Sequence, residues 1–380
     1  MSAEDRRSET GKARRTELQQ VIDRADEATK ALRAKRGKRR SHAKASGNTG
    51  KLDGMLREAQ SYLAHAVNDL DADPLALNVE NGTLRFLTLP DPECPDPDAA
   101  RTVWGVRLFP HERTDLISKL GPVEWDDGAE APLFSGFIER VLPDPEVRAY
   151  VQRYLGYALT ARTSEQVFVF FHGEGANGKS TLVDLVCRLM GDYTTTLPIA
   201  TLVNNDTNKR GGEATPDLAR LPAARLVRTA EPKEGLAFDE PIIKQMTSGE
   251  PQAVRRLNQD FFDFHPTHKL IVSANRKPTI KGNDDGIWRR VTLVPWDVQI
   301  PEAERDKDLP DKLWAERSGV LNWLIEGALD YLGRGGLYPP DKVRAATLEY
   351  RDESDLMGAW ARAALIVTRE PIDKESPGDL

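Results

Sequence analysis

The chain has 380 residues, 39% of them hydrophobic and 30% charged, which is long enough for two or three domains and apolar enough for a substantial core. Its longest apolar runs are far too short for a membrane span, and no basic N-terminal stretch precedes an apolar segment. The two cysteines, far apart in sequence, exclude a disulfide framework and a cysteine-based metal site. We therefore expect a cytoplasmic protein with no membrane partner.

The net charge of −7 is unevenly distributed along the chain. Residues 1–50 hold 14 Lys and Arg against 7 Asp and Glu, so the other 330 residues carry a balance of −14. Because phosphate binding needs concentrated positive charge, any nucleic-acid contact should be confined to the basic arm, residues 1–45, or to a local groove or channel. The alternative for this arm is a solvated, partly helical tail that only keeps the protein soluble.

Residues 46–160 read as a mostly helical domain with a small hairpin. Apolar residues at helical spacing occur over 52–63 and again over 133–162. Between them, Asn81-Gly82 separates two alternating apolar runs and predicts a tight hairpin turn. The stretch 90–98 is dominated by Pro and Asp and predicts a loop.

From residue 166 onwards, short apolar strands alternate with helices. Strands are predicted over 166–171, 225–230, 269–274 and 290–294, and helices over 182–190 and 240–247. Continuous apolar strands separated by helices indicate an α/β fold with a central parallel sheet covered on both faces. We place this core at 161–305 and a helical C-terminal segment with a polar tail at 306–380.

A glycine-rich loop follows the first of these strands and precedes a helix. It comprises Gly173, Glu174, Gly175, Ala176, Asn177, Gly178, Lys179, Ser180 and Thr181, which match the pattern G-x-x-x-x-G-K-[ST]. Such a loop turns its backbone N–H groups around a phosphate, and the helix N-terminus adds positive field. We expect Lys179 to reach the β- and γ-phosphates of ATP and the Ser180 hydroxyl to ligate Mg²⁺.

A P-loop enzyme also needs an acid at the end of a neighbouring strand, to hold Mg²⁺ or to polarise the attacking water. Glu231 follows the predicted strand 225–230, where Pro232 ends it, and Glu234 is a weaker candidate. An ordinary edge-strand glutamate is the alternative reading. Asn275 follows the strand 269–274, and its amide could donate to the γ-phosphate and orient water.

Two arginines, Arg289 and Arg290, leave a glycine-rich loop and enter the last predicted strand. A guanidinium in this position could stabilise charge on a neighbour's γ-phosphate, as an arginine finger does. From these residues alone, a surface ion pair with Asp284 or Asp285 explains the arginines better.

Together, these motifs resemble helicase superfamily 3, in its phage- and poxvirus-type primase–helicase branch. The resemblance rests on residues 173–181, 225–232, 244–250, 261–264, 269–278 and 285–290, with 77–84 and 154–159 upstream, and covers most of the chain. It implies an AAA+-like P-loop NTPase core in a ring, usually a hexamer, that moves 3′→5′ on DNA. It also implies that ATP lies between subunits and that Arg289 or Arg290 reaches the next subunit's site.

The resemblance further implies that residues 254–262 form a DNA-gripping hairpin in the central pore, with Arg255, Arg256, Asn258 and Gln259 as its DNA-binding residues. Many relatives place Lys at the tip, whereas this tip is 258–260, so Arg255 and Arg256 are expected to carry the phosphate contacts. Relatives often carry a primase domain upstream, and no primase-type metal-binding motif is visible in residues 1–160. The chain is thus a stand-alone helicase or a fragment, with primase or other replication proteins as expected partners.

The leading hypothesis is an ATP-dependent replicative DNA helicase of a phage, prophage or plasmid, acting in the bacterial host cytoplasm. One alternative is a DNA-stimulated P-loop NTPase or translocase that does not unwind DNA, such as a packaging or RNA-directed NTPase. Another is a DNA-binding loader or scaffold whose ATP site is a switch. A small-molecule kinase is disfavoured, because no acceptor pocket or lid motif is apparent.

Overall fold

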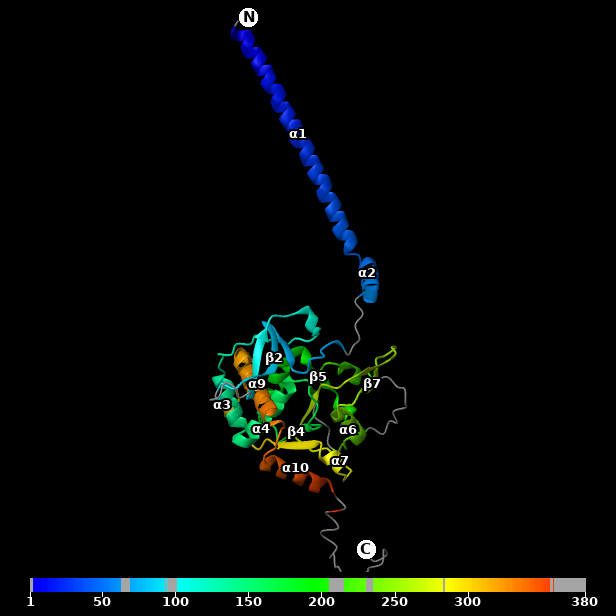
Figure 1. Ribbon diagram of the computed structural model, residues 1–380, viewed down its shortest axis with the longest axis vertical. Coiled ribbons are helices and arrows are strands. Elements are labelled where there is room, and N and C mark those ends of the chain that lie inside the picture. The colour runs from blue at the N-terminus through cyan, green and yellow to red at the C-terminus, as the bar shows by residue number, and fades with distance from the viewer. Residues whose placement is uncertain are drawn as a thin grey trace, which may run out of the picture. The chain divides into compact units, whose positions relative to one another are not determined.

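The computed structural model describes residues 3–62, 69–92, 94, 101–204, 215–229, 235–282, 284–355 and 358 (Figure 1). The chain divides into two compact units, Met1–Ala66 and Val67–Leu380. Within the described residues, no helix is both long and apolar enough to cross a membrane.

The first unit consists of two helices, α1 (Ala3–Ser46) and α2 (Thr49–Tyr62). The region expected as a basic arm is therefore one continuous helix, in which every described side chain is exposed. Its sequence is rich in Ala, Glu, Lys and Arg, which have high helix propensity and lose little rotamer freedom in a helix. The helix follows from this local preference, since no apolar face of it is buried within the described part of the unit.

The second unit carries the sheets and the remaining helices. Its helices are α3 (Pro132–Val141), α4 (Pro145–Leu159), α5 (Lys179–Met190), α6 (Glu240–Ser248), α7 (Asp285–Trp288), α8 (Leu309–Ala315), α9 (Arg317–Arg334) and α10 (Asp341–Ser354). Its strands are β1 (Ala76–Val79), β2 (Gly82–Pro90), β3 (Thr102–Phe109), β4 (Phe168–His172), β5 (Thr194–Leu197), β6 (Leu226–Thr229), β7 (Gln252–Arg255), β8 (Phe261–Phe264), β9 (Lys269–Ala274) and β10 (Val291–Pro295).

A small antiparallel sheet, β1–β2–β3, precedes the larger one. Val79 pairs with Gly82, so the hairpin predicted at Asn81-Gly82 is confirmed, with Glu80 and Asn81 as its two turn residues. The third strand, β3, was not predicted. It pairs with β2 from Thr83 to Pro90, and a glycine in its middle weakens the strand pattern in the sequence.

The larger sheet has five parallel strands in the order β10-β4-β9-β6-β5, which confirms the predicted α/β fold with a central parallel sheet. Successive β4 side chains point to opposite faces: Val169 and Phe171 join one apolar cluster, and Phe168 and Phe170 join the other. The first cluster is completed by α4, α5 and α9, and the second by α6, α7 and α10. Both faces of the sheet are thus covered.

Because the strands are parallel, their carboxyl ends meet at one edge of the sheet and their amino ends at the other. The loop after β4 lies at the carboxyl edge. The antiparallel hairpin β7–β8 lies towards the amino edge, since β8 ends only five residues before β9 begins. The fifth strand, β5, was not predicted, because its sequence is three threonines and a leucine rather than an apolar run.

Helices α4 and α9 lie side by side (Figure 1) and approach closely at a glycine. Asp144 caps α4 by accepting hydrogen bonds from the backbone N–H groups of Glu146 and Val147, at 3.0 and 3.2 Å. A Cβ atom placed on Gly156 would lie 2.1 Å from the backbone nitrogen of Ala328. Only glycine at this position allows the two helix backbones to pack at this distance.

Candidate functional site

The glycine-rich loop connects β4 to α5 at the carboxyl edge of the sheet. Gly178 has φ +82°, and a Cβ atom there would also lie 2.7 Å from Cγ1 of Val141. A Cβ atom on Gly173 would lie 2.2 Å from the backbone oxygen of Trp296. Both positions therefore require glycine. Gly178 is required for its backbone conformation and for close packing, and Gly173 for close packing alone.

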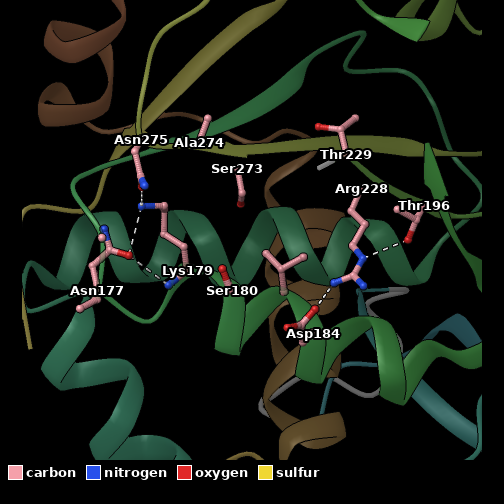
Figure 2. Close-up of a pocket in the computed structure, with 13 residues that line it drawn as sticks. Asn177, Lys179, Ser180, Asp184, Thr196, Arg228, Thr229, Ser273, Ala274 and Asn275 are labelled. Carbon is pink, nitrogen blue, oxygen red and sulfur yellow. Dashed lines mark hydrogen bonds and ion pairs between the residues drawn. The ribbon is translucent and has the colours of Figure 1, made fainter. Parts of the chain in front are cut away.

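Lys179, the first residue of α5, is buried, with a relative exposure of 5%. Its Nζ donates hydrogen bonds to the backbone oxygen of Gly173 at 2.6 Å, to Oδ1 of Asn177 at 3.1 Å and to Oδ1 of Asn275 at 3.2 Å (Figure 2). The ammonium group is held between the loop and the end of β9. Lys179 and Asn275, nearly a hundred residues apart, are thus brought together at one point.

The Asn177 side chain forms hydrogen bonds with other residues of the loop. Its Nδ2 donates to the backbone oxygen of Glu174 at 2.6 Å, while its Oδ1 accepts from Lys179, and the residue is only 3% exposed. The sequence predicted Asn177 as a nucleotide-binding residue. Its side chain instead bonds within the loop, which leaves its backbone N–H as the group that could face a ligand.

A cavity of about 380 Å³ opens beside this loop (Figure 2). Its walls are loop residues from Gly175 to Ser180, the next turn of α5, and the carboxyl ends of β6 and β9. A Cβ atom on Gly175 would have no neighbour within 4 Å, so the loop backbone at this point is open to an incoming group. Phosphate-sized anions fit such a wall of backbone N–H groups at a helix N-terminus.

Two hydroxyls in the wall of this cavity have no hydrogen-bond partner among the described residues. They are Oγ1 of Thr229, on β6, and Oγ of Ser273, on β9, and both atoms are buried. Thr229 pairs with Val272, so Thr229 and Ser273 lie at nearly the same level on neighbouring strands but point to opposite faces of the sheet, and Ser273 points to the face that α5 covers. A buried unsatisfied hydroxyl costs about 1–3 kcal/mol, and a hydrated metal ion on the α5 side of the sheet would supply the Ser273 hydroxyl with a partner.

An ion pair closes the far end of the cavity. Arg228 donates from Nη1 to Oδ1 of Asp184 and from Nε to Oγ1 of Thr196, the latter at 3.1 Å (Figure 2). Asp184 lies one turn after Ser180 on α5, so the pair links α5 to β6 and β5. The sequence analysis missed Arg228 and Asp184. The available signal was a charged residue inside the otherwise apolar strand β6.

The sequence predicts an acidic residue directly after β6. Glu231 and Glu234 lie outside the described residues, and β6 ends at Thr229, two residues before Glu231. Among the described residues, no group of three or more His, Cys, Asp or Glu side chains could hold a metal ion. A P-loop magnesium site does not need such a group, because Mg²⁺ is held there by one hydroxyl, the phosphates, water and a single acid.

His172, the last residue of β4, has a lowered pKa. Burial lowers the pKa of His172 below 6.5, and the positive charges of Lys277 and Lys179 lower it further. The ring is therefore neutral at pH 7. It adds no charge to the edge of the sheet where Lys179 lies.

The two predicted arginines differ sharply in environment. Arg289 is exposed, whereas Arg290 is buried and donates to the backbone oxygen of Gly286 at 3.2 Å and to Oγ1 of Thr247 at 3.1 Å. Both precede β10 and so lie at the amino edge of the sheet, away from the P-loop. The ion pair expected with Asp284 or Asp285 is not formed by either arginine: Asp284 pairs with Lys244, and Asp285 pairs with a residue of α10.

The predicted hairpin is present as β7 and β8, joined by a turn in which Asn258 has φ +57°. Residues 256–261 are all exposed. The guanidinium carbon of Arg255 lies 5.2 Å from the centre of the Phe261 ring, and that of Arg256 lies 5.3 Å from the Phe262 ring. Asn258 and Gln259 occupy the turn, so the four residues predicted to bind DNA lie on one projecting element.

Comparison with protein families matches two parts of the chain. Residues 6–143 match the family described as D5 N terminal like. Residues 171–290, which span the P-loop, Asn275 and both arginines, match a family of unknown function. The match to the first family covers the upstream helices and the small antiparallel sheet.

Two proteins with similar sequences come from viruses. A protein of Acanthamoeba polyphaga mimivirus named "Putative helicase" is 29% identical over 267 residues, 65% of this chain and 27% of that protein. A protein of African swine fever virus named "Putative primase" is 24% identical over 246 residues, 63% of this chain and 24% of that protein. The chain thus spans about a quarter of the length of these two relatives.

Among solved structures, the C-terminal region of NrS-1 is similar over 60% of this chain and 53% of that one, with 15% identity and a TM-score of 0.47. The sequence relatives and the match at residues 6–143 confirm the resemblance that the motifs indicated. This chain is similar in sequence to viral proteins named putative helicase or putative primase, and its motifs resemble those of the primase–helicase branch of helicase superfamily 3.

Proposed function

We propose that this chain is an ATP hydrolase that drives unwinding of DNA during replication of a viral, phage or plasmid genome. The observation that carries the proposal is the position of Lys179, whose Nζ lies 3.2 Å from Oδ1 of Asn275 at the mouth of an open cavity. A cation and an amide placed together beside a phosphate-binding loop are suited to hold and polarise a terminal phosphate.

ATP and Mg²⁺ are the expected ligands of this cavity. The loop backbone would bind the phosphates, and the Ser180 hydroxyl would ligate the metal, with Glu231 as the acid that completes the site. The Ser273 hydroxyl, which has no hydrogen-bond partner among the described residues, supports a hydrated ion here, because water bound to a metal can donate to it. Bound Mg²⁺ would supply neutralising charge to the transferred phosphoryl group.

The positions of the arginines support a ring of subunits. Val291 pairs with Phe168 and Pro295 with His172, so the arginines before β10 are a full strand length, about 13 Å, from the P-loop of their own subunit. Arg289 is exposed at that edge and is the better candidate for an arginine finger in a neighbouring site. A hexamer moving 3′→5′ is the arrangement that the family resemblance implies.

DNA binding is proposed for the hairpin β7–β8. Its turn is exposed, and Arg255 and Arg256 combine positive charge with the neighbouring rings of Phe261 and Phe262. Cations beside aromatic rings are typical of sites for single-stranded nucleic acid. In a ring, the hairpins of all subunits would converge, which allows a chain with a net charge of −7 to bind DNA locally.

Separation of a labelled forked duplex in the presence of ATP and Mg²⁺ tests the proposal. Forks with only a 3′ tail or only a 5′ tail are compared, and Lys179→Ala serves as the inactive control. Separation of the 3′-tailed fork alone, absent in the control, is the expected result. Hydrolysis stimulated by DNA without separation would instead favour a translocase, and substantial hydrolysis by Lys179→Ala would overturn the assignment of the site.

Deleting residues 1–45 distinguishes the remaining alternative, a loader or scaffold that binds DNA through its basic arm. Because the hairpin and the cavity both lie in the second unit, a helicase without the arm should retain DNA-stimulated hydrolysis. Loss of all DNA binding on deletion, with nucleotide binding intact, would favour the scaffold. Primase or other replication proteins are the proposed partners of either form.

A further inference from the structure

A second, larger cavity lies at the amino edge of the sheet, opposite to the P-loop. Its volume is about 680 Å³. Its walls come from segments that precede three strands: residues 70–74 before β1, 219–223 before β6, and 264–267 before β9. Ser118, Lys119 and one residue of the β7–β8 turn, Arg256, complete it. The P-loop and its cavity use none of these residues.

The lining of this cavity is basic. Lys119, Arg220, Arg256 and His265 all line it, and none of the four forms an ion pair with another residue in the part of the chain that the structure describes. Arg220, Arg256 and His265 are exposed, and Lys119 is half-buried. Lys119, Arg220 and His265 can therefore move towards a ligand without breaking an ion pair in the described structure, and Arg256 would leave only the Phe262 ring.

The one acidic residue in the lining, Asp71, offsets only one of the three Lys and Arg charges. Asp71 accepts a hydrogen bond from the backbone N–H of Ser118 at 2.9 Å on one carboxylate oxygen, and from the Ser118 hydroxyl at 2.6 Å on the other. Both oxygens are used to hold the segment that carries Lys119. The cavity keeps an excess of positive charge in a chain whose net charge is −7.

Arg225 is a buried cation close to the lining of this cavity. Arg225, two residues after Ala223 in the lining, is 2% exposed and donates to the backbone oxygens of Leu159 and Ala76. No carboxylate pairs with it among the described residues. Because charges in a medium of low dielectric constant are poorly screened, Arg225 adds to the positive potential of the cavity.

Arg256 connects this cavity to the hairpin. It lies in the turn between β7 and β8, and it also lines the cavity. A polyanion that contacts the hairpin can therefore continue along the same protein surface past Arg220 and Lys119. We propose that this cavity binds the phosphodiester backbone of a single DNA strand next to the hairpin, an inference that rests on the proposed function.

The test compares two double variants that remove the same charges. Lys119→Ala/Arg220→Ala removes two cations from the cavity. Lys342→Ala/Arg344→Ala removes a Lys and an Arg from α10, which pair with exposed acids elsewhere. Binding of a fluorescent oligothymidylate is measured by anisotropy across a series of salt concentrations, with thermal unfolding and binding of an ATP analogue as checks on folding and on the P-loop.

The cavity variant should bind the oligonucleotide about tenfold more weakly, and its dependence of log affinity on log salt should be flatter by about one unit. The α10 variant should bind as wild type does, and both should bind the ATP analogue normally. Equal oligonucleotide affinity in the two variants would overturn the cavity site alone. A wild-type protein that binds the ATP analogue but no single strand would overturn the proposed DNA function itself.

Titration with inorganic phosphate and with a nucleoside monophosphate distinguishes a polynucleotide from a small anion. We expect neither to bind measurably at concentrations where the oligonucleotide saturates. Binding of either one to wild type but not to Lys119→Ala/Arg220→Ala, with unchanged oligonucleotide affinity, would identify a small-anion site and overturn the assignment to DNA.

Discussion

The Nζ atom of Lys179 lies 3.2 Å from Oδ1 of Asn275, which joins the first turn of α5 to the carboxyl end of β9. The amide oxygen of Asn275 faces a cation, so the opposite side of the same amide can donate to an anion. A lysine and an amide held together in this way can act on the same phosphate. We therefore expect Asn275 to act in the site through both its position and its polarity.

Replacing Asn275 with Ala should leave ATP binding largely intact but slow hydrolysis by about 10²- to 10³-fold, the usual effect of losing one donor to a developing negative charge. Asn275→Asp should behave differently. A carboxylate beside Lys179 would pair with it and repel the phosphates, so ATP binding itself should weaken. Calorimetric titration with an ATP analogue and steady-state phosphate release separate the two effects. Equal loss of binding in both variants would contradict this role.

The hydroxyl of Ser273 offers a test of the metal that needs no activity measurement. Because this buried group has no hydrogen-bond partner in the part of the chain that the structure describes, Ser273→Ala should leave the free protein at least as stable as wild type. The gain in melting temperature on adding an ATP analogue should, however, depend less on Mg²⁺ in the variant. Thermal unfolding across a series of Mg²⁺ concentrations measures both quantities.

The matched control is Ser135→Ala, since Ser135 lies exposed on α3 and its hydroxyl donates to a backbone oxygen at 2.9 Å. This control should show the wild-type dependence on Mg²⁺. A Ser273→Ala protein with lower stability and an unchanged response to Mg²⁺ would mean that the hydroxyl serves the fold rather than a hydrated ion.

The strands and the P-loop could be predicted from the sequence because their signals are local. The strand β9, Lys269–Ala274, is a continuous apolar run, and the loop before α5 combines glycines with Lys179. In contrast, whether the hydroxyls of Thr229 and Ser273 face the P-loop depends on how β6 and β9 pair and on which face of the sheet α5 covers. Nothing in either segment alone separates these hydroxyls from ordinary strand residues.

The same reasoning explains the arginines. The sequence could not distinguish Arg289 from Arg290, which are adjacent and equally charged. The difference arises when α7 packs against α6, which brings Thr247 to the guanidinium of Arg290 at 3.1 Å and leaves Arg289 exposed. Burial of this kind depends on contacts across about forty residues, which a local pattern does not contain.

Arg289→Ala and Arg290→Ala should therefore fail in different ways. Arg289→Ala should fold and bind ATP normally but hydrolyse it about 10³-fold more slowly, the lower end of the effect of an arginine finger. Arg290→Ala should lose about 1–3 kcal/mol of folding free energy, because the hydrogen bonds to Thr247 and Gly286 are lost. Denaturant unfolding and ATP hydrolysis, measured on both proteins, check these outcomes.

Mixing Arg289→Ala with Lys179→Ala tests whether the arginine acts between subunits. In a mixed ring, the intact arginine of one variant can face the intact P-loop of the other, so part of the activity should return. No recovery at any mixing ratio, in rings shown to exchange subunits, would contradict a role for Arg289 in a neighbouring site.

The buried histidine His268 should make stability depend on pH. Burial, together with the charge of the neighbouring Lys269, lowers its pKa from 6.5 to about 4. The unfolded chain therefore binds a proton more readily than the folded one, so stability is complete above pH 6.5 and falls as the pH drops towards 4. The contribution lost is about 3 kcal/mol.

Thermal unfolding of wild type and His268→Phe between pH 7 and pH 4 isolates this contribution, because every other titrating group is shared. The variant should lose less stability across the interval. His265→Gln is the control, since His265 lies three residues away but is exposed, and it should follow the wild-type profile. Parallel profiles for wild type and His268→Phe would show that His268 does not produce the loss.

The close approach of α4 and α9 gives a test of the packing that supports the sheet. A methyl group on Gly156 would lie 2.1 Å from the backbone nitrogen of Ala328, and backbone cannot move aside as a side chain can. Gly156→Ala should therefore cost about 1–3 kcal/mol in denaturant unfolding. Gly136→Ala, in α3 where nothing lies within 4 Å, should instead stabilise by about 0.5–1 kcal/mol through helix propensity. If both substitutions stabilised the protein, the two helices would not pack at the distance described.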